Sequence, residues 1–203
     1  SPQNKIMSRI KIGNQDLQFG AESPKGEFVE LDGKDFYRIS KVDQMPPFFM
    51  TLVSPFDHWM FIASNGGLTA GRGDADRAIF PYYTDDKLVD NAEFTGPKTL
   101  IRVADPKKPN SAWLWEPFST RYQGVYRLER NLYKSLGAEQ LVFEEINFDL
   151  LLKFSYRWAF SQKYGFIRKV EVQNIGDQSR EIECLDGLEN LLPSNVDGLM
   201  QDR

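Results

Sequence analysis

The sequence predicts an all-β fold in which two antiparallel sheets stack face to face. Strand-like segments dominate the 203 residues, and their apolar residues alternate with polar ones or are β-branched and aromatic. Clusters of glycine, proline and asparagine separate these segments, whereas helical periodicity is weak throughout. A hydrophobic content of 41% and an aromatic content of 13% supply enough apolar side chains for the core of such a sandwich.

The clearest element is a hairpin centred on Asn65-Gly66-Gly67. An aromatic, apolar strand enters this turn, and a strand of small residues leaves it toward Arg72. Asn-Gly tolerates the positive φ angles of a tight hairpin turn. The same glycines have the spacing of a phosphate-binding loop, but Arg72 stands in place of its lysine and Gly73 in place of its Ser or Thr. No apolar-periodic helix follows to hold a phosphate, so we reject a nucleotide-binding loop.

Further strands follow from alternation and β-branched content, at residues 98–103, 125–129, 148–160 and 167–172. The last of these enters a turn cluster at 174–177, and a further strand-like segment follows at 180–185. We expect 167–172 and 180–185 to pair as a hairpin across that turn, with Val170, Val172 and Ile175 facing the core.

Composition excludes several classes of function. The 29 acidic and 25 basic residues are well mixed, and their balance of -4 includes no basic stripe, so neither nucleic acid nor a charged membrane surface is expected as a partner. One cysteine, Cys184, and one histidine, His58, exclude a disulfide and metal sites rich in cysteine or histidine. We therefore expect no metal and no cofactor.

No apolar run reaches the about 18 residues of a membrane span, and no signal peptide is visible. The cytoplasm is the favoured compartment. Export stays open because the chain begins at Ser1-Pro2, like a processed or engineered start, and a removed signal leaves no trace.

The acidic and histidine candidates for chemistry each have a simpler explanation, and we expect no catalytic residue. Asp85 and Asp86 lack the pattern of a calcium loop and are expected in a solvated loop. The two carboxyls of a glycosidase lie on either side of the bond that is cleaved, whereas Glu144 and Glu145 are neighbours in the sequence. We expect these glutamates at the end of a strand, with one of the two side chains exposed. His58 has no orienting partner in the sequence, so packing is favoured over a general-base role.

The aromatic residues supply the candidate binding site. Trp113 and Trp115 share one face of a strand, and aromatic rings offer apolar surface to the C–H side of a sugar. Arg72 offers a fork of hydrogen-bond donors. The candidate substrate-binding residues are therefore Arg72, Tyr82, Tyr83, Trp113 and Trp115. Two alternatives stay open: the rings fill the core, and Arg72 forms an ion pair that pins the hairpin, with Asp74, Asp76 or Asp85.

Several motifs, in their order and spacing, resemble the N-terminal β-sandwich domain of disaccharide phosphorylases of the cellobiose and chitobiose phosphorylase type (glycoside hydrolase family 94). The resemblance covers residues 33–190, most of the chain. It is carried by residues 33–39, 45–48, 64–67, Arg72, Arg77, 80–83, 101–102, 115–118 and 168–182. The stretch 68–70 departs from the family, which has aromatic and serine residues there.

The resemblance implies a galactose mutarotase-like supersandwich that precedes a helical linker and an (α/α)6 barrel. In such enzymes the barrel carries the catalytic aspartate and the phosphate-binding residues. This chain would then be a non-catalytic, carbohydrate-associated domain that packs on the barrel and shapes the rim of its active site. The expected organisation is an N-terminal extension with the first strands (1–32), the sandwich (33–190) and the start of a linker to a further domain (191–203).

The expected partners are that barrel, an oligosaccharide and a second copy of the chain. A free-standing carbohydrate-binding module is the alternative function. A sugar epimerase is less expected, because its chemistry pairs a histidine with a carboxylate and His58 is the single histidine.

Overall fold

The computed structural model describes residues 10–12, 15–17, 23–81, 85–122 and 124–193. Of these residues 53% lie in strands and 7% in helices, and every strand pair is antiparallel. The predicted all-β, antiparallel class is confirmed. None of the helices in these ranges is long and apolar enough to cross a membrane.

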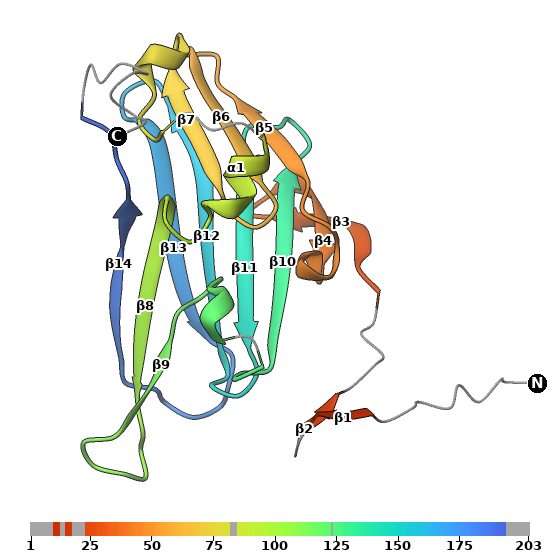
Figure 1. Cartoon of the computed structure of the whole chain (residues 1–203), viewed down its shortest axis with the longest axis vertical. Coiled ribbons are helices and arrows are strands. Elements are labelled where there is room, and N and C mark those ends of the chain that lie inside the picture. The colour runs from red at the N-terminus through yellow and green to blue at the C-terminus, as the bar shows by residue number, and fades with distance from the viewer. Residues whose placement is uncertain (1–9, 13–14, 18–22, 82–84, 123, 194–203) are drawn as a thin grey trace, which may run out of the picture.

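One layer of the fold is a six-stranded sheet in the order β13-β12-β11-β10-β4-β3 (Figure 1). Its strands are β3 (Lys25–Leu31), β4 (Lys34–Ser40), β10 (Leu128–Ser135), β11 (Leu141–Asn147), β12 (Leu152–Ser161) and β13 (Gly165–Asn174). Large apolar side chains alternate on one face of β11 and β12, and Phe143, Phe154 and Trp158 are almost fully buried there. This face is the floor of the core.

Two three-stranded sheets cover that face. The first contains β5 (Phe49–Val53), β6 (His58–Ala63) and β7 (Leu68–Arg72), and the second contains β14 (Ile182–Glu189), β8 (Gly96–Ala104) and β9 (Ala112–Trp115). Leu52 and Met60 of the first sheet, Ile101 of the second and Phe143 of the floor belong to one buried cluster. The sandwich therefore has two layers, one of them divided between two sheets.

The remaining elements are short. They are β1 (Ile10–Ile12) paired with β2 (Gln15–Leu17), the 3-10 helices η1 (Val42–Gln44), η2 (Ala75–Arg77) and η3 (Thr120–Tyr122), and the helix α1 (Asp85–Asp90). The helix was not predicted: Asp85 and Asp86 begin α1 and do not lie in a loop.

The predicted hairpin at residues 65–67 is confirmed. Ile62 of β6 pairs with Leu68 of β7, and the Gly66 amide donates to the carbonyl of Ala63 at 2.9 Å. Gly66 has φ 93°, a value that favours glycine. A Cβ on Gly67 would collide with the backbone carbonyl of Leu88 in α1, so the turn and the helix lie in direct contact.

The predicted pairing of 167–172 with 180–185 is wrong. β13 pairs with β12, whereas β14 pairs with β8 in the opposite layer, with Ile182 opposite Val103. The turn cluster does not close a hairpin because Ile175 donates its amide to Leu151 and the Asn174 side chain bonds to its own loop. Val170 lies beside Tyr156 on the inner face, yet 36% of it is exposed at this open sheet edge. Ile175, beyond the end of β13, does not face the core as predicted and is 40% exposed.

Two predicted strands begin later than expected. Residues 125–127 and 148–151 are turns, and β10 and β12 start at Leu128 and Leu152. The Asp149 carboxylate accepts both the backbone N–H and the side-chain Nε–H of Arg127, each at 2.7 Å. This pair fixes the two turns against each other, so neither segment can extend its strand.

Candidate functional site

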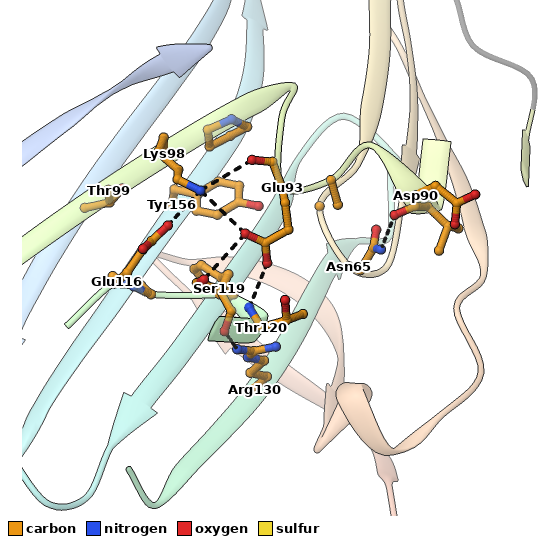
Figure 2. A pocket seen from close by; sticks show the side chains of 16 residues that line it. Asn65, Asp90, Glu93, Lys98, Thr99, Glu116, Ser119, Thr120, Arg130 and Tyr156 are labelled. Atoms are coloured by element: carbon orange, nitrogen blue, oxygen red, sulfur yellow. Dashed lines mark hydrogen bonds and ion pairs between the residues drawn. The ribbon is translucent and has the colours of Figure 1, made fainter. Parts of the chain in front are cut away.

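A polar pocket lies where the Asn65–Gly67 turn, α1 and the segment after β9 meet the floor of the sandwich (Figure 2). Its volume is about 290 Å³. Its charged and hydroxyl-bearing lining residues are Asp90, Glu93, Lys98, Thr99, Glu116, Ser119, Thr120, Arg130 and Tyr156. We call it the turn pocket.

Lys98 of β8 stands between two carboxylates of the turn pocket. Its Nζ lies 2.7 Å from Oε1 of Glu116 and 3.5 Å from Oε2 of Glu93 (Figure 2). Burial acts to lower the pKa of Lys98, but Glu116 and Glu93 outweigh it and raise the pKa above its ordinary value. Glu116 is only 3% exposed, so the ion pair with Lys98 compensates the cost of burying a carboxylate.

Glu93 forms hydrogen bonds with the other wall of the pocket, the segment that contains Ser119 and Thr120. Its Oε1 accepts the backbone N–H of Thr120 at 2.7 Å, and its Oε2 accepts the Ser119 hydroxyl at 3.4 Å. Burial opposes its ionisation, but the hydrogen bonds from Thr120 and the charge of Lys98 outweigh burial and lower the pKa of Glu93. The carboxylate is therefore ionised at neutral pH and has no proton to give to a reacting group.

A second ion pair holds the loop that follows β9. Glu145 of β11 is fully buried, and its Oε2 accepts the Phe118 amide at 2.5 Å and lies 3.7 Å from Nε of Arg130. Arg130 in turn donates to the Ser119 carbonyl at 2.9 Å. Burial raises the pKa of the Glu145 carboxyl, against the opposing effects of Arg130 and the Phe118 amide.

Phe118 is a strained residue of that loop, which these hydrogen bonds and the ion pair hold in place. Its φ of 66° lies in the left-handed region, which is strained for a residue with a large side chain. Its ring packs edge-on against Phe143, Phe154 and Tyr156, the last at 5.2 Å between centroids. Aromatic packing on one side and Glu145 on the other hold the strained backbone in place.

Tyr156 supplies the one hydroxyl that rises from the floor into the turn pocket. Its ring is stacked on Phe143 at 4.9 Å, and the Arg168 guanidinium lies 4.9 Å from the ring centroid. No residue in the described part of the chain forms a hydrogen bond with the hydroxyl, and a Cβ on Gly66 would lie 2.9 Å from it. Burial raises the pKa of Tyr156, so the hydroxyl keeps its proton and can donate.

The candidate residues from the sequence do not converge on this pocket. Arg72 ends β7 beside His58, at the opposite end of the strand from the turn, and Trp113 is 36% exposed on β9. Trp115 is fully buried in the core, as the alternative in which the rings fill the core expects. Tyr82 and Tyr83 lie outside the described residues.

The ion pair expected for Arg72 is not seen with Asp74 or Asp76. Asp74 instead lies 4.0 Å from Arg77, an exposed pair. The side chain of Asp85 is not among those that the structure describes, so that third pairing stays a prediction.

His58 packs, as the sequence favours. It is 7% exposed, its Nδ1 lies 3.3 Å from the Ser54 hydroxyl, and its ring lies against Phe160 and Phe166. Burial, and then the charge of Arg72, lowers the pKa of His58, so the ring is neutral at physiological pH.

The two adjacent glutamates do not lie at a strand end with one exposed, as expected. Both are buried in the middle of β11, on opposite faces of the sheet. Glu144 accepts hydrogen bonds from Asn131 at 2.9 Å and from the Tyr133 hydroxyl at 3.0 Å on the outer face. They therefore cannot act together on one bond. Nowhere in the described ranges do three or more acidic, histidine or cysteine residues gather as metal ligands.

Sequence reasoning missed the charged residues of the turn pocket because they come from four separate segments. The one feature of the sequence that could have indicated the pocket is Glu116, a charged residue between a tryptophan of the core and a proline in 115–118. Comparison with protein-family models gives no match, and comparison with curated proteins gives none either.

Proposed function

We propose that this chain is a non-catalytic, carbohydrate-associated domain of a glycoside phosphorylase-like enzyme, where it packs on an (α/α)6 barrel and shapes the rim of its active site. One observation carries the proposal. Residues 64–67 and 115–118, two segments in which the chain resembles that family, meet at the turn pocket. A shared sequence pattern thus coincides with a polar cavity.

The chemistry of the pocket suits a sugar. Sugar hydroxyls both donate and accept, and the pocket offers the acceptor oxygens of Glu93 together with the donors Lys98 and Tyr156. Phe118 adds apolar surface beside them. Such a mixture orients a small polyhydroxyl molecule better than it would an apolar one.

The same residues argue for binding without catalysis. The pKa of Glu93 is lowered and Lys98 lies between carboxylates, so neither group is poised to transfer a proton near neutral pH. His58, the residue that an epimerase would use, is buried among aromatic rings. This arrangement favours the accessory role over the epimerase.

The test is an assay of the natural gene product with a neutral disaccharide and inorganic phosphate, beside this chain alone. We expect the gene product to form a sugar 1-phosphate and this chain to form none. A gene product that contains no barrel, or one that does not react with cellobiose, chitobiose or related disaccharides, would contradict the phosphorylase-like assignment.

A free-standing carbohydrate-binding module is the second candidate. It is favoured by Trp113, whose ring is 36% exposed on β9 and offers an apolar face of the kind that packs on a sugar. Saturable binding of oligosaccharides by this chain, with a gene product limited to the sandwich, would support this candidate over the first.

A further inference from the structure

We propose that the turn pocket takes one neutral, unphosphorylated sugar ring and rejects phosphate and sugar phosphates. This inference rests on the proposed function and names the ligand class of the same pocket.

The cations of the pocket are already paired. Lys98 lies 2.7 Å from Glu116, and Arg130 lies 3.7 Å from Glu145. A bound phosphate needs charge-assisted donors, and it would compete with Glu116 for Lys98 and with Glu145 for Arg130. Glu116 and Glu145 are 3% and 0% exposed, so weakening either ion pair leaves a buried carboxylate less well compensated.

The remaining charges act in the same direction. Glu93 is held ionised, and Asp90 adds a further carboxylate to the lining. A dianionic phosphate group would therefore enter a cavity whose unneutralised charge is negative, where like charges repel. A neutral sugar meets no such opposition, because its hydroxyls can bond to carboxylates and ammonium groups without displacing them.

Size and the free hydroxyl complete the inference. The 290 Å³ volume lies near the lower end of small-molecule sites, which suits one sugar ring and not a longer chain held inside. Tyr156 is 3% exposed and its hydroxyl faces the cavity without a partner in the described part of the chain. A buried polar group of this kind is expected to bond to whatever fills the cavity.

The test is a titration of the chain followed by ¹H–¹⁵N NMR, with glucose, N-acetylglucosamine, glucose 1-phosphate and inorganic phosphate as separate probes. We expect at least one neutral sugar to shift the backbone amides of Gly66 and Thr120 with a millimolar Kd. Glucose 1-phosphate and inorganic phosphate should shift them at least tenfold more weakly.

Two variants locate the binding. Tyr156→Phe keeps the buried ring and should weaken neutral-sugar binding about three- to tenfold, the share of one hydrogen bond. Tyr164→Phe is the matched control, since Tyr164 is 69% exposed and outside the pocket, and it should change nothing. Glu93→Gln removes one negative charge and should raise the affinity for glucose 1-phosphate relative to glucose, which a purely structural glutamate would not do.

Several outcomes would overturn the inference. Phosphate or glucose 1-phosphate binding as tightly as glucose would refute the charge argument. Shifts confined to amides outside the pocket would refute the site but leave the proposed function standing, because sugar would still be bound. An absence of any shift also refutes the inference, while the accessory role is judged separately by the phosphorolysis assay.

Discussion

The ion pair between Lys98 and Glu116 should be a main support of the turn pocket, and Lys98→Met tests this directly. The substitution keeps the length and apolar stem of the side chain while removing its charge. Among the described residues, Glu116, which is 3% exposed, then keeps as its cation Arg121 at 3.9 Å, an exposed side chain. Glu93 is less affected because Thr120 and Ser119 still donate to it.

The expected loss follows from burial. Breaking a fully buried ion pair destabilises a protein by about 3–5 kcal/mol. The Lys98 side chain is 21% exposed and Arg121 compensates in part, so we expect a decrease of about 2–4 kcal/mol in the free energy of unfolding. For a chain of this size each kcal/mol lowers the Tm by about 2–4 °C, so the total shift is about 4–16 °C.

Thermal and urea unfolding of three variants measure this. Lys34→Met is the matched control, because the Lys34–Glu139 pair has side chains that are each 51% exposed and should contribute less than about 1 kcal/mol. The double variant Lys98→Met/Glu116→Gln removes the stranded charge and should recover at least half of the loss. If Lys98→Met were no more destabilising than Lys34→Met, the supporting role of this pair would be refuted.

Three further predictions concern the walls of the pocket and the core. Gly67→Ala should destabilise the chain by about 1–3 kcal/mol in urea unfolding, since its Cβ would collide with backbone, whereas Gly187→Ala, with nothing nearby, should stay within about 0.5 kcal/mol. Glu145 has a folded pKa above its unfolded one, so its contribution to stability is present at low pH and is lost as pH rises through the folded pKa. Wild type should therefore lose stability relative to Glu145→Gln as the pH rises above the ordinary carboxyl pKa of 4.5, and a difference that stays constant with pH would contradict the burial argument. Trp115→Ala should cost about 3–5 kcal/mol and Trp113→Ala far less, and equal losses would show that the two rings are not buried as described.

The sequence was sufficient for the class of fold and for its clearest turn. Asn65-Gly66-Gly67 predicts the β6–β7 hairpin because the geometry of a turn depends on a few neighbouring residues. The position that requires a positive φ is occupied by Gly66, which adopts it readily. The same local logic failed for β13 and β14. A turn cluster at 174–177 carries no information about which strand the following segment pairs with. In the structure that segment, β14, pairs with β8 of the opposite layer.

The site shows a similar limit. Trp113 and Trp115 follow the expected alternation, yet alternation cannot tell a ring that fills the core from one that lines a cleft. Lys98, Glu116 and Arg130 show no spacing that marks them as a set, because the sheets bring them together from separate segments. A charged residue next to core aromatics in 115–118 is the kind of signal that could have directed attention to the pocket.

The measurement that tests the central claim most directly is a calorimetric titration of this chain with glucose and, separately, N-acetylglucosamine, beside Lys98→Met/Glu116→Gln. One sugar ring has about 12 non-hydrogen atoms, and at about 0.3 kcal/mol each it binds with a Kd of a few millimolar. We predict saturable binding in that range to the wild-type chain and clearly weaker binding to the double variant. Equal binding by both proteins, or none at about 10 mM ligand, a few times the expected Kd, would contradict a sugar site in the turn pocket.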